Sequence, residues 1–248
     1  MNIGTACAAH LSRHDVPVLM VARNSDSLEN IRNGLIDLGC NADLISYCAA
    51  DATTDTGAIE IIKALDGRPF SWIQSLGLGA GTYDLPDENP YLPVEKISPK
   101  LLEVELGIVV ATHCLLTHFL PHLREQVKKD LPAKIVFITS MSGVRGYRFG
   151  SAHVAAKHAL TGFVRGIHAE LIDMGITPFE VRPGGIDTGF YDPESVRKVM
   201  DVLAKQDNMW SGFPPTFAPP LKVAEAVYRA LFIDGCPIEQ EVRAPHQN

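Results

Sequence analysis

The sequence predicts an α/β fold in which a doubly wound parallel sheet is covered by helices on both faces. Short, continuously apolar runs such as Val16 to Ala22 are typical of strands that are buried on both sides. Between these runs, apolar residues recur every three or four positions, which is the spacing of amphipathic helices. Strands that alternate with helices imply βαβ units with right-handed crossovers.

The expected elements follow one another in chain order. We expect helix 101–120 to end near Pro121, because proline has no amide hydrogen to donate. Asp192 and Pro193 resemble the N-cap and first residue of a further helix. No repeat or linker divides the chain, so residues 1–248 are interpreted as one domain. Strands are expected at 16–22, 42–49, 70–76, 134–140 and 176–181 and, as an edge strand, near 242; helices at 6–11, 28–38, 59–65, 101–120, 152–174 and 221–232.

The beginning of the chain departs from this plan. A doubly wound sheet normally begins with a central strand that feeds a glycine turn, whereas this chain opens with a helical pattern. Residues Met1 to Gly4 are similar to the tail of such a turn. One hypothesis is that Met1 is an internal methionine, preceded by roughly 10–15 residues of strand and turn. The alternative is a natural variant without this strand, in which two strand edges would be exposed.

Composition and charge exclude several classes of partner. The net charge of −7 argues against nucleic acid or an anionic membrane as the main partner. No segment approaches the roughly 20 uninterrupted apolar residues of a membrane span, and the first residues lack the pattern of a secretory signal. Five cysteines without a CxxC pair indicate reduced thiols, so we expect a cytoplasmic protein.

The most specific pattern lies between Ser140 and Lys157. In ITSMSGVRGYRFGSAHVAAKHAL, His153 stands four residues before Lys157 and thirteen after Ser140. The segment resembles the Ser and Tyr-x-x-x-Lys pattern of the short-chain dehydrogenase/reductase family, with histidine in place of tyrosine. The resemblance covers nearly the whole chain, apart from a shortened N-terminus, and it implies a Rossmann-like fold.

The resemblance implies that Ser140, His153 and Lys157 are the catalytic residues. In the family, tyrosine protonates a carbonyl while the nicotinamide delivers hydride, and lysine lowers the phenol pKa and holds the ribose. Imidazole has a free pKa of about 6.5 and can itself act as a general acid; a nearby Lys157 cation would lower that pKa. The helix asparagine of the family falls on Ile108, which has no hydrogen-bonding side chain, so we expect the proton relay to be interrupted.

Other segments match the dinucleotide site of the family. Asn2-Ile3-Gly4 matches the end of the turn that brings N–H groups to the pyrophosphate. Arg23 stands where a basic residue suits the 2′-phosphate of NADP, so NADP is expected, with NAD or an ordinary surface arginine as alternatives. Asp51 matches the aspartate that contacts adenine, and a helix N-cap is its competing role. The remaining implied cofactor residues are Ala80, Gly81, Lys157, Pro183, Gly184, Ile186 and Thr188, of which Ile186 and Thr188 would lie near the nicotinamide carboxamide and the phosphates.

Three functions stay open on these residues. The first is an NADP-dependent oxidoreductase that acts on a small-molecule carbonyl or alcohol with His153 as the acid. The second is a catalytically inactive protein that binds a dinucleotide or another small ligand, and the third is a non-redox lyase or isomerase on the same scaffold. The resemblance also implies a homodimer or homotetramer assembled through helices 101–120 and 152–174.

Two histidines, a tyrosine and two loop segments are further candidates for functional residues. His118 and His122 have a spacing that can bind metal, but Pro121 stands between them and no third ligand beyond Glu125 is evident, so no metal is expected. Tyr147 is either a substitute acid or an aromatic residue of the substrate loop. Segments 83–93 and 209–220, rich in aromatic residues and proline, are expected to border a pocket for an apolar substrate.

Overall fold

The computed structural model describes residues 1–77, 93–147, 149–188 and 217–243. Within these residues, β1 (Val18–Ala22) pairs with β2 (Ile45–Ala49) in a two-stranded sheet. All the pairings are parallel. The larger sheet contains, in spatial order, β3 (Trp72–Gln74), β4 (Lys134–Ile138), β5 (Thr177–Pro183) and β6 (Glu239–Val242), with the expected edge strand at one side.

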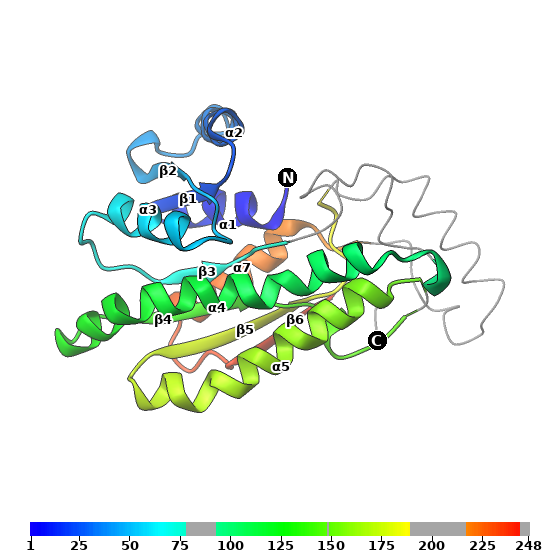
Figure 1. Ribbon diagram of the computed structural model, residues 1–248. Helices are drawn as coiled ribbons and strands as arrows, with labels where there is room; N and C mark the ends of the chain where they lie inside the picture. Colours follow the sequence, from blue (N-terminus) through cyan, green and yellow to red (C-terminus); the bar gives the residue numbers. More distant parts are fainter. Residues whose placement is uncertain (78–92, 148, 189–216, 244–248) are drawn as a thin grey trace.

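Helices cover both faces of these sheets, as predicted (Figure 1). One face is covered by α1 (Ile3–Ser12), α2 (Ser25–Asp37) and α7 (Pro220–Phe232). The other face is covered by α3 (Asp55–Leu65), α4 (Pro99–Lys128) and α5 (Ser151–Asp173). The fold is therefore a Rossmann-like, doubly wound α/β arrangement.

The central strand β4 shows how the apolar runs produce this layering. Ile135 and Phe137 pack into the cluster formed with α3, α4 and α5. Val136 and Ile138 pack into the cluster formed with α1 and α7. Because successive side chains of a strand point to opposite faces, a strand between two helical layers favours apolar residues at successive positions.

The described residues form two separate sheets. In the described part of the chain α1 is the first element, and β1 and β3 belong to different sheets. Helix α1 connects them: Ala8 and Ala9 pack with β1 and β2, whereas Cys7 and Leu11 pack with the larger sheet and α7. Among the described residues, no strand pairing connects the two sheets. The packing of α1 against both of them holds them together.

The expectation that the helix ends near Pro121 is wrong. Helix α4 continues to Lys128, with Pro121 inside it. The lost hydrogen bond is offset by packing beyond the proline, where Leu123 is completely buried. The buried Gln126 side chain accepts a hydrogen bond from the Phe70 amide at 2.9 Å and donates to the Phe70 carbonyl at 2.9 Å and the Pro132 carbonyl at 2.8 Å.

The start of β2 also differs from the expectation. Strand β2 begins at Ile45 because Ala42–Leu44 form a 3-10 turn, capped by the Asn41 side chain.

Helix α4 is the one helix in the described ranges that is long and apolar enough to span a membrane. A core helix of a globular protein can have the same composition, and α4 lies over the large sheet. Asp192, Pro193 and nearly all of segments 83–93 and 209–220 lie outside the described residues.

Candidate active site

Ser140 lies at the carboxyl ends of β4 and β5. It follows β4 directly and caps the 3-10 turn η4 (Met141–Gly143), where its Oγ accepts a hydrogen bond from the Ser142 amide at 3.0 Å. The same Oγ lies 3.4 Å from the Pro183 carbonyl oxygen at the end of β5. The carboxyl edge of a parallel sheet is where ligands bind in folds of this class.

The turn after Ser140 packs directly on α5. A Cβ on Gly143 would lie 2.3 Å from Thr161 Oγ1 and 2.7 Å from the Lys157 carbonyl oxygen. Only glycine allows this close approach. Gly143 therefore holds the Ser140 turn against the helix that carries His153 and Lys157.

His153 and Lys157 lie on one face of α5, because residues four apart on a helix are neighbours. The His153 side chain is 25% exposed, and its Nδ1 lies 3.7 Å from Oε2 of Glu105. Glu105 comes from α4, and its side chain is only 5% exposed. The sequence interpretation did not single out this carboxylate, although it stands on the buried, apolar face of a predicted helix, where an acidic residue is unusual.

The Lys157 ammonium has a perturbed proton affinity. Burial lowers the pKa of Lys157 from 10.5 to about 8, and the negative charge of Glu105 opposes that shift. A lysine that loses its proton near neutral pH is typical of functional sites. Glu105 thus acts electrostatically on both His153 and Lys157.

Ile108 contributes no polar group to the site, because the isoleucine side chain is a hydrocarbon. Its side chain is buried in the cluster between α4 and the sheet. Thr112 Oγ1 donates a hydrogen bond to the Ile108 carbonyl at 2.7 Å and accepts one from Gln74 Nε2 at 2.8 Å. Oε1 of Gln74 is buried and has no hydrogen-bond partner among the described residues.

The N-terminus of α1 lies beside the end of β3. Asn2 caps the helix by accepting a hydrogen bond from the Thr5 amide at 2.8 Å. A Cβ on Gly4 would lie 3.3 Å from Oγ of Ser75, which follows β3. Ile3 and Gly4 therefore begin a helix at the carboxyl edge of the sheet, where the resemblance expects a pyrophosphate.

Arg23 and Asp51 follow the neighbouring strands β1 and β2, which are paired through Ala22 and Ala49. Asp51 Oδ1 accepts hydrogen bonds from the Thr53 amide at 3.0 Å and the Thr53 hydroxyl at 2.7 Å. Desolvation acts to raise the pKa of Asp51, but these bonds and the positive charge of Arg23 outweigh it and lower the pKa. The N-cap of α3 is Thr54, so the competing N-cap role of Asp51 is wrong.

The segment after β5 stays at the same edge of the sheet. The Gly184 amide donates to the Val242 carbonyl at 2.8 Å, and Ile186 is buried and bridges to Ala218. The Thr188 amide donates to the Ile186 carbonyl at 3.0 Å. Pro183, beside Ser140, connects this segment to the candidate catalytic turn. Ala80 and Gly81 lie outside the described residues.

Tyr147 packs against the start of α5. A Cβ on Gly150 would lie 2.0 Å from the Tyr147 ring, so this glycine leaves room for the aromatic side chain. The structure thus gives Tyr147 a packing role next to the first turn that carries His153, and its role as a substitute acid stays untested.

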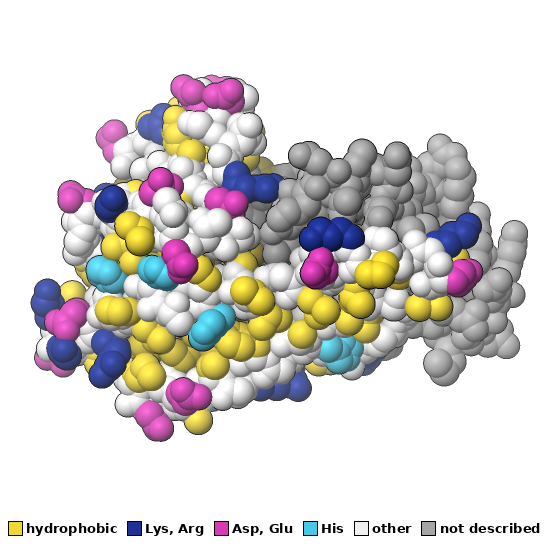
Figure 2. Space-filling model, in the orientation of Figure 1, with side chains coloured by type: hydrophobic (Ala, Val, Ile, Leu, Met, Phe, Trp, Pro, Cys, Tyr) yellow, Lys and Arg dark blue, Asp and Glu magenta, His cyan; other side chains and the backbone are white. Residues whose placement is uncertain are grey.

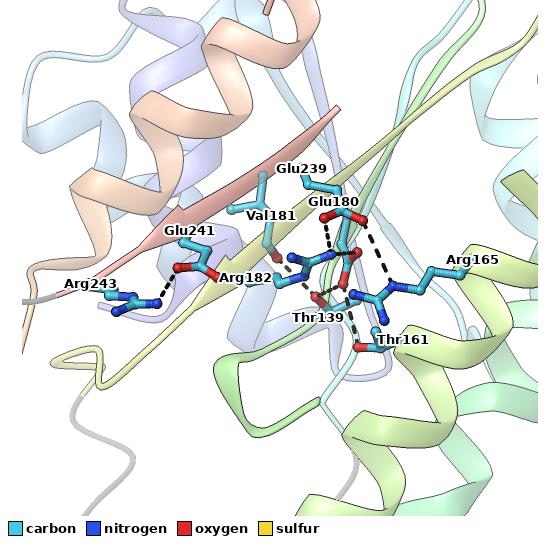
Figure 3. A network of polar contacts seen from close by, with 9 residues as sticks. All are labelled: Thr139, Thr161, Arg165, Glu180, Val181, Arg182, Glu239, Glu241 and Arg243. Carbon is cyan, nitrogen blue, oxygen red and sulfur yellow. Dashed lines mark hydrogen bonds and ion pairs between the residues drawn. The ribbon is translucent and has the colours of Figure 1, made fainter. Parts of the chain in front are cut away.

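A buried polar network supports the two strand ends that carry the site (Figure 3). Glu180 accepts from the Thr139 hydroxyl at 2.7 Å and from Arg182 at 2.6 Å, and Arg182 also pairs with Glu239 at 2.6 Å. Thr139 directly precedes Ser140, and Arg182 directly precedes Pro183. The one hint in the sequence is Glu180, a charged residue inside the strand expected at 176–181, and its partners cannot be identified from the sequence.

Comparison with known proteins identifies relatives over most of the chain. Residues 2–197 match the family model described as short chain dehydrogenase. The uncharacterized oxidoreductase YusZ of Bacillus subtilis is 27% identical over 204 residues, which make up 82% of this chain and 68% of that protein. The NADP-dependent 3-hydroxy acid dehydrogenase of Schizosaccharomyces pombe is 30% identical over 93% of this chain and 83% of that protein. The chain spans 53% of dehydrogenase/reductase SDR family member 7 of Mus musculus, at 27% identity over 75% of this chain.

Solved structures share the fold. The 3-ketoacyl-(acyl-carrier-protein) reductase of Brucella melitensis, complexed with NADH, gives a TM-score of 0.78 at 16% identity over 99% of this chain and 94% of that one. An alcohol dehydrogenase of the archaeon Thermococcus sibiricus, complexed with 5-hydroxy-NADP, gives 0.72 at 22% identity over 99% of this chain and 93% of that one.

Proposed function

The chain belongs to the short-chain dehydrogenase family, and we propose on that basis that it is an oxidoreductase. The reaction is hydride transfer between a nicotinamide dinucleotide, NADP(H), and a small carbonyl or alcohol substrate. His153 takes the position of the family tyrosine as the general acid, with Ser140 and Lys157 beside it.

The observation that carries this proposal is the pairing of His153 with a buried carboxylate. Glu105 Oε2 lies 3.7 Å from Nδ1 of His153. A carboxylate beside Nδ1 fixes the orientation of the imidazole ring, so that Nε2 is the nitrogen that serves the substrate. Burying an unpaired carboxylate is costly, and Glu105 has two compensating partners, since it lies beside His153 and interacts electrostatically with Lys157.

In the direction of carbonyl reduction, each of these residues has its own role. Ser140 Oγ donates a hydrogen bond to the substrate oxygen, and His153 Nε2 gives that oxygen its proton. The Lys157 ammonium binds the ribose hydroxyls as a hydrogen-bond donor. The dinucleotide, when bound, supplies the hydride. Because the His153 side chain is 25% exposed, the imidazole regains its proton from solvent.

Arg23 favours NADP over NAD as the cofactor. A guanidinium pairs with a phosphate in bidentate geometry, and Arg23 follows β1 next to Asp51. The residues at this edge also fit a dinucleotide sterically, since Gly4 carries no side chain where α1 meets Ser75. Titrating the chain with NADPH and NADH, with fluorescence as the signal, tests this: Arg23→Ala is expected to weaken NADPH binding at least tenfold and leave NADH binding unchanged.

Turnover is tested separately with a panel of carbonyl substrates. Wild-type protein is expected to oxidise NADPH, His153→Ala to lose at least 99% of that rate, and His153→Tyr to retain or raise it. NADPH binding without turnover by both wild type and His153→Tyr would favour the second candidate, a binding protein without catalysis. The observation that favours a binding protein without catalysis is Ile108, a buried apolar residue at the position of the relay asparagine.

The expectations for domain organisation, partners and localisation are also part of this proposal. We infer a single domain over residues 1–248, with a small molecule as the partner rather than nucleic acid or a membrane surface. All five cysteines are free, and a cytoplasmic, reducing environment suits unpaired thiols.

A further inference from the structure

We propose that Asp55, Cys114 and His118 form a zinc site that connects α3 to α4, separate from the candidate active site. Asp55 is the first residue of α3, whereas Cys114 and His118 lie one turn apart on α4. Glu105, the nearest active-site residue on α4, is nine positions from Cys114, or about 14 Å along the helix axis.

The three candidate ligand atoms have the spacing of one coordination sphere. Cys114 Sγ lies 3.5 Å from Asp55 Oδ1, and His118 Nε2 lies 3.6 Å from the same oxygen. All three atoms lie within 4.8 Å of one another. In a tetrahedral zinc centre with ordinary bond lengths, sulfur, nitrogen and oxygen ligands stand about 3.3–3.6 Å apart. Side-chain movements of a few tenths of an ångström to about 1 Å would therefore close the site.

The histidine is already oriented for ligation. His118 Nδ1 lies 2.9 Å from the Cys114 carbonyl oxygen, which can only accept a hydrogen bond. The proton of the neutral ring is therefore on Nδ1, and the lone pair of Nε2 points to the Asp55 and Cys114 side of the cluster. A backbone carbonyl on the second ring nitrogen is the usual support of a metal-bound histidine.

The donor set selects zinc among the divalent ions. Thiolate and imidazole ligands suit zinc, whereas magnesium and calcium prefer oxygen ligands. Binding transfers the Cys114 thiol proton to the buffer and forms a zinc–sulfur bond, while Asp55 and His118 supply an oxygen and a nitrogen ligand. The Asp55 side chain is 82% exposed, so water has access to the fourth position.

The spacing of His118 and His122 along the sequence does not identify this cluster. His122 is exposed on the next turn, and no contact in the described residues brings it to His118. The true neighbours are Cys114, one turn earlier, and Asp55, which is 59 positions from Cys114 in the chain and comes close only through α3–α4 packing.

The test is a titration of the reduced, chelator-treated chain with zinc, and with cobalt as a spectroscopic probe. We expect one zinc per chain with micromolar or tighter affinity, a thiolate-to-cobalt absorption band, and a rise in Tm with zinc. Cys114→Ala and His118→Ala should weaken zinc binding at least thirtyfold, and Cys114→Ala should abolish the band. His122→Ala and Cys48→Ser are matched controls and should change neither.

Three results would overturn the proposal. They are no zinc uptake by wild type at 100-fold molar excess, binding that survives in both Cys114→Ala and His118→Ala, and equal loss in His122→Ala. Asp55→Asn is the variant to use if Cys114→Ala does not fold, because the Asp55 side chain is exposed. It should weaken zinc binding at least tenfold with an unchanged Tm in the absence of metal.

Discussion

Glu105 is the single residue on which the proposed chemistry depends most. Replacing it with glutamine keeps its volume and removes the negative charge beside His153 and Lys157. We expect kcat to fall about 10–100-fold, the range of a weakened general acid, with KM changed less than threefold. The decline of kcat/KM toward high pH should also begin at lower pH, because the Glu105 charge no longer opposes the lowering of the Lys157 pKa by burial.

The matched control for Glu105 is Glu103→Gln on the same helix. Glu103 is exposed and pairs only with Lys100 at 2.9 Å. Its loss should leave kcat, KM and the pH profile unchanged. Equal kinetics for both variants would remove Glu105 from the mechanism, and Glu105→Asp should restore part of the wild-type pH profile if the charge is what matters.

Lys157 should make stability depend on pH in a recognisable direction. Burial lowers the folded-state pKa of Lys157 from 10.5 to about 8. Between these values the unfolded chain binds a proton that the folded chain does not, so unfolding takes up a proton and its free energy rises with pH. Relative to Lys157→Met, the free energy of unfolding of wild type should increase by about 1 kcal/mol from pH 7.5 to 9.5, after allowance for partial exposure. Urea unfolding at both pH values measures it; parallel changes in the two proteins would contradict the lowered pKa.

Candidate site residues can be proposed from the sequence where a fixed local spacing connects them. Ser140, His153 and Lys157 lie within one strand–turn–helix segment, so counting along the chain finds them. Glu105 acts on His153 from 48 positions away, and only tertiary packing brings the two together. The available hint was its place on α4, where the buried side chains Leu101, Val104, Ile108 and Thr112 mark the same face.

Among the elements, the contact between η4 and α5 positions the catalytic turn. Gly143→Ala would place a Cβ 2.3 Å from Thr161 Oγ1 and 2.7 Å from the Lys157 carbonyl oxygen. The turn must then move away from α5 and carry Ser140 with it. We expect kcat/KM to fall at least tenfold with a loss of stability of about 1–3 kcal/mol. Gly162→Ala, on α5 with open space around it, should stabilise the chain by about 0.5–1 kcal/mol and leave activity intact.

The end of α4 is held by a side chain rather than by helix propensity. Gln126→Ala would leave the Phe70 amide and the Phe70 and Pro132 carbonyls without their partner. The free energy of unfolding should fall by about 2–4 kcal/mol, because buried polar groups become unsatisfied. Glu125→Ala, which removes only an exposed pair with Lys128, should change it by less than about 0.5 kcal/mol. Similar losses for both variants in urea unfolding would show that helix propensity dominates.

The elements themselves were largely predictable because local patterns specify them. The run Lys134 to Ile138 is apolar on both faces, and the structure gives it a helical layer on each. Helix ends were less predictable: Pro121 disfavours the helix locally, but Leu123 and Gln126 supply tertiary contacts that a reading of proline alone does not include. The polar network of Glu180 and Arg182 was also out of reach, since its partners come from four segments.

At the scale of the whole molecule, an apolar strip on α4 remains uncovered. Leu102, Leu106 and Val110 are spaced four residues apart and exposed, Val110 to 70%. Figure 2 shows apolar side chains gathered along this helix. Exposed apolar strips of this kind are typical of protein–protein interfaces. Together with the family resemblance, the strip supports our proposal of a homodimer, or a homotetramer, assembled through α4 and α5.

A single charge in that strip should break such an assembly. Val110→Glu places a carboxylate where two copies of α4 would meet, and an unpaired buried charge costs several kcal/mol. Light scattering after gel filtration should show dimers or tetramers for wild type and monomers for Val110→Glu at about 10 μM chain. Val94→Glu is the control, because Val94 is equally exposed but lies before α4, and it should leave the assembly unchanged. A wild-type monomer at that concentration would instead leave the α4 strip open to a different partner, and the active site would then have to be complete within one chain.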